Sequence, residues 1–254
     1  MDFRISVILP TRNAAVHLEA CLESLRLQTF RDFEVCVIDA CSEDKTREVV
    51  SRYMDLPGMS LRFLSGIDSG VYEAMNKGVA RARGEWLYFI GADDVLYDDD
   101  VFTEMVRFLC ADDADIIYGD VVQRSDGRRY CGRSSWHRLI LDRNICHQAI
   151  FYRKTVFQKL GNFDVKYRSW ADWEFNIRCF RNIDIHTQWV DRKIAIYNNV
   201  TGISCQVDRE LSARLPPKWA RYLLGSIYWL RNLLARRSRG IFASPKLRLP
   251  IDRM

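Results

Sequence analysis

The sequence predicts an α/β fold with a Rossmann-like, mostly parallel sheet that carries helices on both faces. Short β-branched or aromatic runs alternate with segments whose apolar residues are spaced as in a helix. The chain has 254 residues, 48% of them hydrophobic, which is enough for one large core. Acidic residues recur shortly after three of the apolar runs. These residues would lie at the carboxyl ends of the strands, and in open α/β sheets ligands bind beyond those ends.

Strands and helices are expected in strict alternation over the first 120 residues. The expected strands are short apolar runs, at residues 5–9, 33–38, 61–64, 86–90 and 115–118. The expected helices lie between them, with Ser42 as a candidate cap for the second, at residues 14–28, 42–53, 71–83 and 101–110. Because parallel neighbours need a crossover, this order favours a parallel sheet with helices on both of its faces.

The pattern becomes less regular after Gly119. Ser125–Gly127 is typical of a turn, Ile150–Tyr152 of a strand and Trp170–Arg181 of a helix. This part of the chain also carries more aromatic residues in irregular segments. The expected organisation is therefore one domain in two halves followed by a separate tail, with boundaries at 1–120, 121–215 and 216–254, so that the domain spans 1–215.

The tail is strongly basic. Residues 211–254 contain ten Lys and Arg residues against one acidic residue, so they carry +9, and residues 1–210 carry −4. Residues 218–239 place apolar side chains on one helical face and basic ones on the others, and they include Trp219, Tyr222 and Trp229. A basic amphipathic helix of this kind is typical of an anionic membrane surface. A helix packed on the domain and a poorly ordered solubilising terminus are the alternatives.

The sequence favours a cytoplasmic protein, with peripheral contact to the inner face of the membrane. No apolar stretch approaches the roughly 18–20 residues needed to cross a bilayer, and no signal-peptide pattern opens the chain. None of the eight cysteines forms a CxxC pair, which argues against a zinc ribbon.

Adjacent carboxylates follow the expected strand at 86–90. Asp93 and Asp94 would repel each other there, and a divalent cation such as Mg²⁺ or Mn²⁺ would relieve that repulsion. A solvated turn or helix cap is the alternative, equally compatible with the spacing alone. Asp39 and Asp68 follow two other strands, where carboxylates can accept hydrogen bonds from a base or from ribose hydroxyls. This repetition favours a ligand site at the sheet edge.

Three segments together resemble glycosyltransferase family 2 proteins of the GT-A fold. They are Val7–Asn13, Asp68–Gly78 and Ala82–Asp94, and the similarity extends over roughly residues 3–200. The chain is particularly similar to bacterial members that build surface polysaccharides. The resemblance implies inverting transfer of a sugar from a nucleotide-sugar, with a UDP-sugar favoured, to a glycan or polyprenyl-linked acceptor. Residues 1–120 would then bind the nucleotide-sugar, and 121–215 would face the acceptor.

The resemblance also implies roles in the donor half. The nucleotide pocket would be bordered by Pro10, Thr11 and Arg12, with Asp39 holding the base and Asp68 lining the nucleotide and metal region. Asp94 would bind Mn²⁺ or Mg²⁺, and Asp93 would contact the ribose or the metal. Many relatives carry Arg where this chain has Met75, and Lys77 is a candidate for the missing positive charge.

The second half would supply the catalytic base. Ser169–Phe175 resembles the acidic motif at the start of the helix after the acceptor loop, and it places Asp172 at the position of the base that deprotonates the acceptor hydroxyl. Glu174 is the fallback. His147 is a candidate contact for the diphosphate, metal or acceptor, and Trp170 is a candidate surface for a sugar, together with Trp136 and Trp173. Structural roles are the alternatives for the histidine and for the tryptophans.

Other functions fit the sequence less well. A sugar nucleotidyltransferase usually holds its triphosphate with a Gly-rich loop, and residues 10–15 contain no glycine. A non-enzymatic nucleic-acid-binding protein would use the basic tail, but the rest of the chain is acidic; no nucleic-acid partner is expected. A dinucleotide oxidoreductase is disfavoured because no GxGxxG follows the first strand.

Overall fold

The computed structural model describes residues 3–111, 114–202, 206–217, 220, 221 and 224. The first half alternates strands and helices as predicted. Its elements are β1 (Phe3–Thr11), α1 (Ala15–Arg26), β2 (Phe33–Asp39), α2 (Thr46–Met54), β3 (Ser60–Ser65), α3 (Val71–Arg81), β4 (Gly84–Phe89), β5 (Val95–Leu96), α4 (Val101–Leu109) and β6 (Ile116–Gln123). The second half contains β7 (Arg129–Tyr130), α5 (Trp136–Leu141), the 3₁₀ turn η1 (His147–Ala149), β8 (Ile150–Arg153), α6 (Lys154–Leu160), α7 (Ala171–Arg181), β9 (Thr187–Tyr197) and α8 (Arg209–Arg214).

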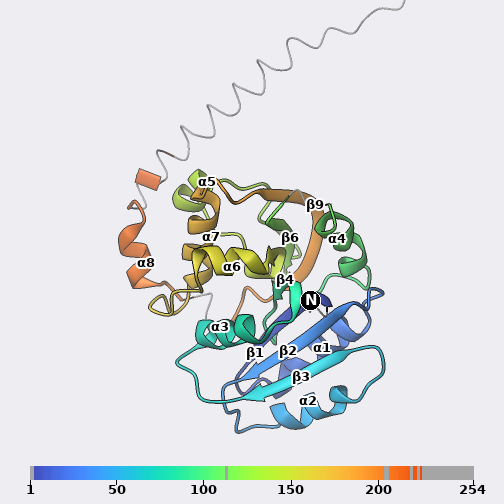
Figure 1. The fold of residues 1–254 in the computed structure, drawn as a ribbon. Helices are drawn as coiled ribbons and strands as arrows, with labels where there is room; N and C mark the ends of the chain where they lie inside the picture. Colours follow the sequence, from blue (N-terminus) through green and yellow to red (C-terminus); the bar gives the residue numbers. More distant parts are fainter. Residues whose placement is uncertain (1–2, 112–113, 203–205, 218–219, 222–223, 225–254) are drawn as a thin grey trace, which may run out of the picture.

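The strands form one curled sheet in the order β3-β2-β1-β4-β8-β6-β9-β5, with β7 paired to β6 (Figure 1). The first four strands are parallel to one another, and β9 is parallel to β6. Antiparallel pairing enters with β8, β5 and β7. The predicted α/β fold is confirmed, as a mixed sheet whose parallel part is built from the N-terminal strands.

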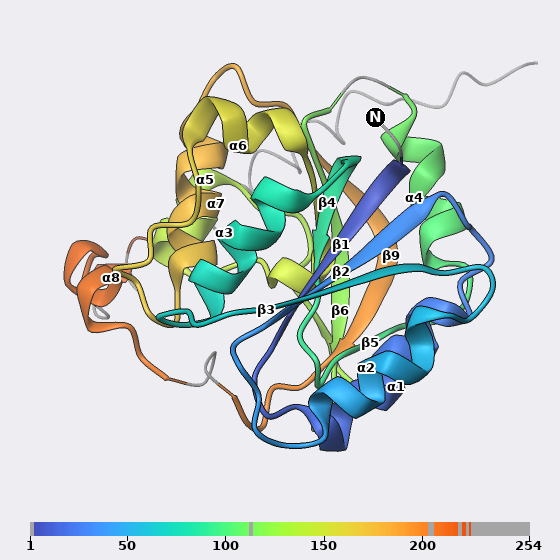
Figure 2. The same ribbon diagram turned by 60° about the horizontal axis from the view of Figure 1, so that its bottom comes forward.

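The helices cover both faces of the sheet (Figure 2). Alternate residues of a strand point to opposite faces, so Val7 of β1 packs with α1, α2 and α4, whereas Ile8 packs with α3 and the helices of the second half. Gly78 allows α3 to lie close to β1, because a Cβ at this position would be 2.4 Å from Cγ2 of Ile8. Strands buried on both faces explain why the sequence shows them as continuous apolar runs.

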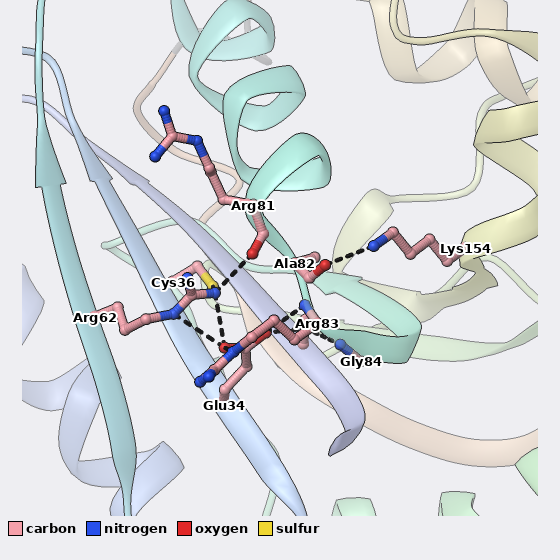
Figure 3. A network of polar contacts seen from close by, with 9 residues as sticks. Glu34, Cys36, Arg62, Arg81, Ala82, Arg83, Gly84 and Lys154 are labelled. Carbon is pink, nitrogen blue, oxygen red and sulfur yellow. Dashed lines mark hydrogen bonds and ion pairs between the residues drawn. The ribbon is translucent and has the colours of Figure 1, made fainter. Parts of the chain in front are cut away.

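A buried carboxylate fastens the amino-terminal end of the parallel strands (Figure 3). Glu34 of β2 is fully buried and accepts hydrogen bonds from Ser6 Oγ at 2.6 Å, Arg62 Nη2 at 2.7 Å and the backbone N–H of Arg83 at 2.6 Å. Arg62 also donates to the carbonyl of Arg81, at the end of α3. Burial raises the pKa of Glu34, but these donors together lower it below its ordinary value. The network ties β1, β2 and β3 to the turn between α3 and β4.

Two local expectations differ from the structure. Ser42 does not cap a helix: its hydroxyl donates to Asp39, and α2 begins only at Thr46, whose N–H donates to Asp44. The eleven-residue strand β9 was not predicted, because its first half mixes charged and apolar residues without an apolar run. In the described residues no helix is both long and apolar enough to cross a membrane. The amphipathic helix expected over 218–239 falls almost entirely outside the described residues.

Candidate functional site

A cavity of about 650 Å³ opens at the carboxyl-terminal edge of the parallel strands. The end of β1 contributes Pro10 to the lining, and the loops that follow β1 and β4 contribute Arg12 and Asp93. The second half of the chain contributes further lining residues, which include His147 and Asp172. The cavity therefore brings together the two halves that the sequence assigns to donor and acceptor.

The carboxylates of Asp93 and Asp94 differ in environment. Asp94 is 2% exposed, and its oxygens accept hydrogen bonds from Gln148 Nε2 at 2.6 Å and from the backbone N–H of Asn198 at 2.8 Å. Burial, followed by the charge of Asp93, raises the pKa of Asp94 to about 6. Asp93 is half-buried and faces the cavity, with Oδ2 accepting from Asn198 Nδ2 at 2.7 Å. Asp93 is therefore the more open of the two carboxylates.

Gly91 leaves room for this pair. A Cβ at Gly91 would lie 2.8 Å from Oδ2 of Asp94 and 2.9 Å from Oδ1 of Asp93. Contacts that short are sterically forbidden, so any larger residue would displace a carboxylate. Glycine at this position is therefore needed for both side chains to turn toward the same end of the strand.

Asp172, the predicted base, lies on the first turn of α7 and lines the cavity. It is 7% exposed. Its Oδ1 accepts a hydrogen bond from Tyr72 Oη at 2.8 Å, and its Oδ2 accepts one from Asn144 Nδ2 at 3.0 Å. The carboxylate is therefore held by two neutral donors on the first turn of a helix. The arrangement suits a group that receives a proton.

His147 stands between the two carboxylate sites. Its Nδ1 is 3.4 Å from Oδ2 of Asp172, and the next residue, Gln148, donates to Asp94. The 3₁₀ turn η1 fixes this spacing, because both residues belong to it. The structure thus places His147 at the cavity wall.

Asp39 lies behind the cavity wall. Thr11 and Ser42 donate to its Oδ1, and Ser65 and the N–H of Ser42 donate to its Oδ2. Burial raises the pKa of Asp39, but these hydrogen bonds lower it below its ordinary value. Asp39 is 2% exposed. It therefore organises the loops after β1, β2 and β3, and neither Asp39 nor Thr11 forms part of the cavity lining described here.

Three further predicted residues are not part of the cavity lining. Asp68 has one oxygen, Oδ2, that is buried without a hydrogen-bond partner among the described residues, and burial raises its pKa. Lys77 donates to the carbonyl of Ile67 and pairs with Glu73. Glu174 pairs with Arg178 along α7. The structure therefore does not bring Lys77 or Glu174 into the cavity.

The aromatic candidates separate in the same way. Trp170 and Trp173 line the cavity with their ring centroids 5.0 Å apart, and Tyr130 lies on the same lining. Trp136 is not part of the lining and is 40% exposed. Trp173 also donates from Nε1 to the carbonyl of Leu139, which makes Trp170 the freer surface.

Four site residues were not predicted. Tyr72 lies inside the Asp68–Gly78 segment and Gln148 beside His147, so both were close to recognised motifs. Asn144 and Asn198 lie in irregular stretches, where periodicity gives no signal.

The residues around Asp93 and Asp94 fit a divalent cation that shares its coordination with a ligand. Within the described ranges, no group of three or more His, Cys, Asp or Glu side chains is placed to hold a metal alone. Asp93 and Asp94 both contribute to the cavity lining, and their carboxylate oxygens are donors suited to Mg²⁺ or Mn²⁺, which keep water and phosphate oxygens as further ligands.

Comparison with known proteins identifies a relative in sequence and solved structures with a similar fold. The chain is 43% identical over 213 residues to a PGL/p-HBAD biosynthesis glycosyltransferase of Mycobacterium tuberculosis, covering 83% of each protein. Its fold is similar to that of S. aureus TarS in complex with UDP-GlcNAc, with a TM-score of 0.68 and 22% identity over 81% of this chain and 62% of that one. It is also similar to the mannosyltransferase PcManGT from Pyrobaculum calidifontis in complex with GDP-Man and Mn²⁺, with a TM-score of 0.60 and 20% identity over 76% and 56%.

These structural likenesses bear out the GT-A fold that the resemblance implied, although the chain spans less than two thirds of either structure. The family model described as glycosyl transferase family 2 matches residues 6–180, which include the strands of the parallel sheet, the Asp93–Asp94 pair and Asp172. The chain therefore belongs to glycosyl transferase family 2 and is a nucleotide-sugar glycosyltransferase.

Proposed function

We propose that this enzyme transfers a sugar with inversion from a nucleoside-diphosphate sugar, with a UDP-sugar favoured, to a glycan or polyprenyl-linked acceptor in bacterial surface polysaccharide biosynthesis. The observation that carries the proposal is the single cavity that Asp93, Asp94 and Asp172 share. The two sites are linked through the neighbouring residues His147 and Gln148. A donor held at one end would present its anomeric carbon to an acceptor held at the other.

Asp172 is the proposed base. It receives the proton of the acceptor hydroxyl while that oxygen forms a bond to the anomeric carbon and the bond to the nucleoside diphosphate breaks. Attack from the face opposite the leaving group inverts the anomeric centre, so an α-linked donor gives a β-linked product. The fixed position of Asp172 on α7 supports this role, because proton transfer needs a carboxylate at a defined place in the cavity.

Asp93 and Asp94 are the proposed metal residues, with Asp93 as the more accessible ligand and Asp94 bound behind it to Gln148 and Asn198. A bound Mn²⁺ or Mg²⁺ would neutralise charge on the departing diphosphate. The half-buried position of Asp93 at the cavity wall supports this division of roles. Arg12 is exposed at the same cavity and would add a positive charge near the diphosphate.

The remaining donor residues are proposed to shape the nucleotide pocket. Pro10 lines the cavity directly, whereas Thr11 acts by donating to Asp39. Asp39 would hold the base of the nucleotide indirectly, through the loops after β1, β2 and β3. Asp68 offers a carboxylate oxygen, Oδ2, that has no hydrogen-bond partner among the described residues. Lys77 donates to the carbonyl of Ile67, next to Asp68, and would act through this loop, since it does not line the cavity itself.

Thermal stabilisation by nucleotides tests the donor assignment. UDP, GDP, dTDP and CMP are each added with and without Mn²⁺, since a ligand that binds only the folded state raises its stability by about 2.7 kcal/mol at a hundredfold excess over Kd. A Mn²⁺-dependent shift with UDP supports the proposal. A shift with another nucleotide alone would change the donor class, and no shift with any of them would contradict the site.

We also propose that the basic tail, residues 216–254, brings the enzyme to the inner face of the cytoplasmic membrane. The support is that these residues include nine basic residues against one acidic residue, together with the apolar spacing over 218–239. The full chain should sediment with anionic vesicles, and a chain ending at residue 215 should not. Equal sedimentation of both would contradict the proposal.

A further inference from the structure

Tyr72 connects the donor half to the proposed base. It lies in the first turn of α3, directly after the loop that contains Asp68 and Gly70, and its ring is buried against Phe163. Its hydroxyl is 2.8 Å from Oδ1 of Asp172 and 2.9 Å from the carbonyl oxygen of Ser169. The contact joins two residues 100 positions apart in the sequence.

The other oxygen of Asp172 is held from a different direction. Asn144 donates to Oδ2 at 3.0 Å, and its own carbonyl oxygen accepts from Asn176 Nδ2 at 2.9 Å. Asn176 in turn accepts from Tyr152 Oη at 2.7 Å. Because each amide has its acceptor oxygen occupied, the chain of contacts fixes which end of Asn144 faces the carboxylate.

Both groups that the Tyr72 hydroxyl contacts, Asp172 Oδ1 and the Ser169 carbonyl oxygen, are acceptors, so the single hydroxyl hydrogen is shared between them. Burial, followed by the charge of Asp172, raises the pKa of Tyr72 well above its ordinary value, so the phenol keeps its proton. A carboxylate at this position has no hydrogen to give while it is ionised. A buried hydroxyl that lost this partner would keep only the Ser169 carbonyl.

We propose that Tyr72 is a positioning residue, which with Asn144 fixes the Asp172 carboxylate in one orientation relative to the loop that contains Asp68 and Gly70. The inference rests on the proposed function of Asp172 as the base. Tyr72 lies on α3, which begins directly after the loop that contains Asp68 and Gly70. Its hydrogen bond therefore fixes the position of Asp172 relative to the bound donor. Loss of the hydroxyl therefore affects the proton-transfer step more than donor binding.

The groups around Asp172 that carry or exchange protons are few in the described residues. His147 faces it from η1 at 3.4 Å, and Tyr72 faces it from α3. The pKa of Cys146 is raised by its contact with Cys131 and by burial, that of Tyr152 mainly by burial, and the charge of Asp172 adds to both. Asp208 lies beyond the backbone N–H of Ser169, which donates to it at 3.1 Å. Of these groups, His147 is the one whose ring nitrogen faces Oδ2 of Asp172, so the test includes a variant that lacks it.

The test compares Tyr72→Phe with Tyr118→Phe in the full chain. Tyr118 is a matched control, because it is also buried and its hydroxyl bonds to the backbone of Ser134 without contacting Asp172. Steady-state transfer and its pH dependence are measured for both, and each profile is repeated in a His147→Gln background. We expect Tyr72→Phe to lower kcat about tenfold, the equivalent of one hydrogen bond to a charged group, with donor KM changed less than about twofold.

The pH profile separates positioning from a general structural defect. Removing a donor from the ionised carboxylate makes protonation easier, so the acid limb of the kcat profile should move to higher pH in Tyr72→Phe. Tyr118→Phe should leave that limb in place. An unchanged kcat and acid limb in Tyr72→Phe would overturn the inference while the proposed function stands. Absence of transfer by the wild-type chain would instead count against the proposed function.

A second variant covers the case in which Tyr72→Phe does not fold. Asn144→Ala removes the other donor of Asp172, so it should move the acid limb in the same direction and lower kcat. Because both residues act on one carboxylate, the effects in the double variant should be smaller than the product of the single ones. Multiplicative effects, or an unmoved acid limb in Asn144→Ala, would contradict a shared positioning role.

Discussion

The side-chain amide of Gln148 donates a 2.6 Å hydrogen bond to Oδ2 of Asp94, and both groups are buried. With the N–H of Asn198 on Oδ1, both oxygens of Asp94 have protein partners. Asp93, its neighbour in sequence, keeps an accessible carboxylate at the cavity wall. The pair thus divides into a carboxylate fixed by the protein and one open to a ligand.

Asp93→Asn should abolish the Mn²⁺ dependence of nucleotide binding. The amide keeps the size of the side chain but lacks the charge that attracts a divalent cation. Thermal shifts with UDP, measured with Mn²⁺ and with a chelator, should then coincide. Asp99→Asn, at an exposed position outside the cavity, serves as the control. A Mn²⁺-dependent shift of wild-type size in Asp93→Asn would argue against the assigned ligand.

Gln148→Leu should destabilise the fold by about 2 kcal/mol, because it leaves the buried Asp94 carboxylate short of a donor. Urea unfolding with a chelator present measures this effect without any contribution from a bound cation. A variant as stable as the wild type would mean that water or another residue satisfies Asp94 equally well.

Glu34→Gln should lower the unfolding free energy by about 2 kcal/mol at neutral pH. The pKa of Glu34 is lowered in the folded state, so its contribution is present above its unfolded pKa and is lost as the pH falls through the folded pKa. The difference between wild type and variant should therefore be largest near pH 7 and shrink below about pH 4. Urea unfolding across this range provides the measurement, and a constant difference would contradict the role of the ionised carboxylate.

Gly78→Ala should destabilise the protein by about 2 kcal/mol, because the added Cβ would overlap Ile8 and push α3 away from β1. Gly66→Ala is the matched control, since a Cβ there has no atom within 4 Å. The melting temperatures of the two variants measure this difference in stability. Equal stability of both variants would show that α3 can shift at little cost.

The sequence predicts the parallel part of the sheet well, because strands such as β1 and β4 are buried on both faces and appear as continuous apolar runs. Strand β9 escapes prediction for the opposite reason, since its first half mixes charged and apolar residues. Ser42 shows another limit. A serine can cap a helix or bond to a nearby carboxylate, and only the fold shows that Asp39 is its partner.

The candidate site is predictable where a motif lies at a strand or helix end, as with Asp93, Asp94 and Asp172. The sequence does not indicate which of two adjacent aspartates is open, because that depends on Gln148 and Asn198, which are distant in the chain. It ranks Asp172 above Glu174 only through the family resemblance. The structure turns the first toward the cavity and pairs the second with Arg178.

The most direct test of the central claim is the Asp172→Asn variant, assayed for sugar transfer and for nucleotide binding in parallel. The account predicts that transfer falls by at least about a hundredfold, in the range for loss of a positioned base. Nucleotide-induced thermal stabilisation should remain at the wild-type level, because Asp172 comes from the half of the chain that is proposed to face the acceptor. Transfer at the wild-type rate would contradict the assignment of Asp172 as the base.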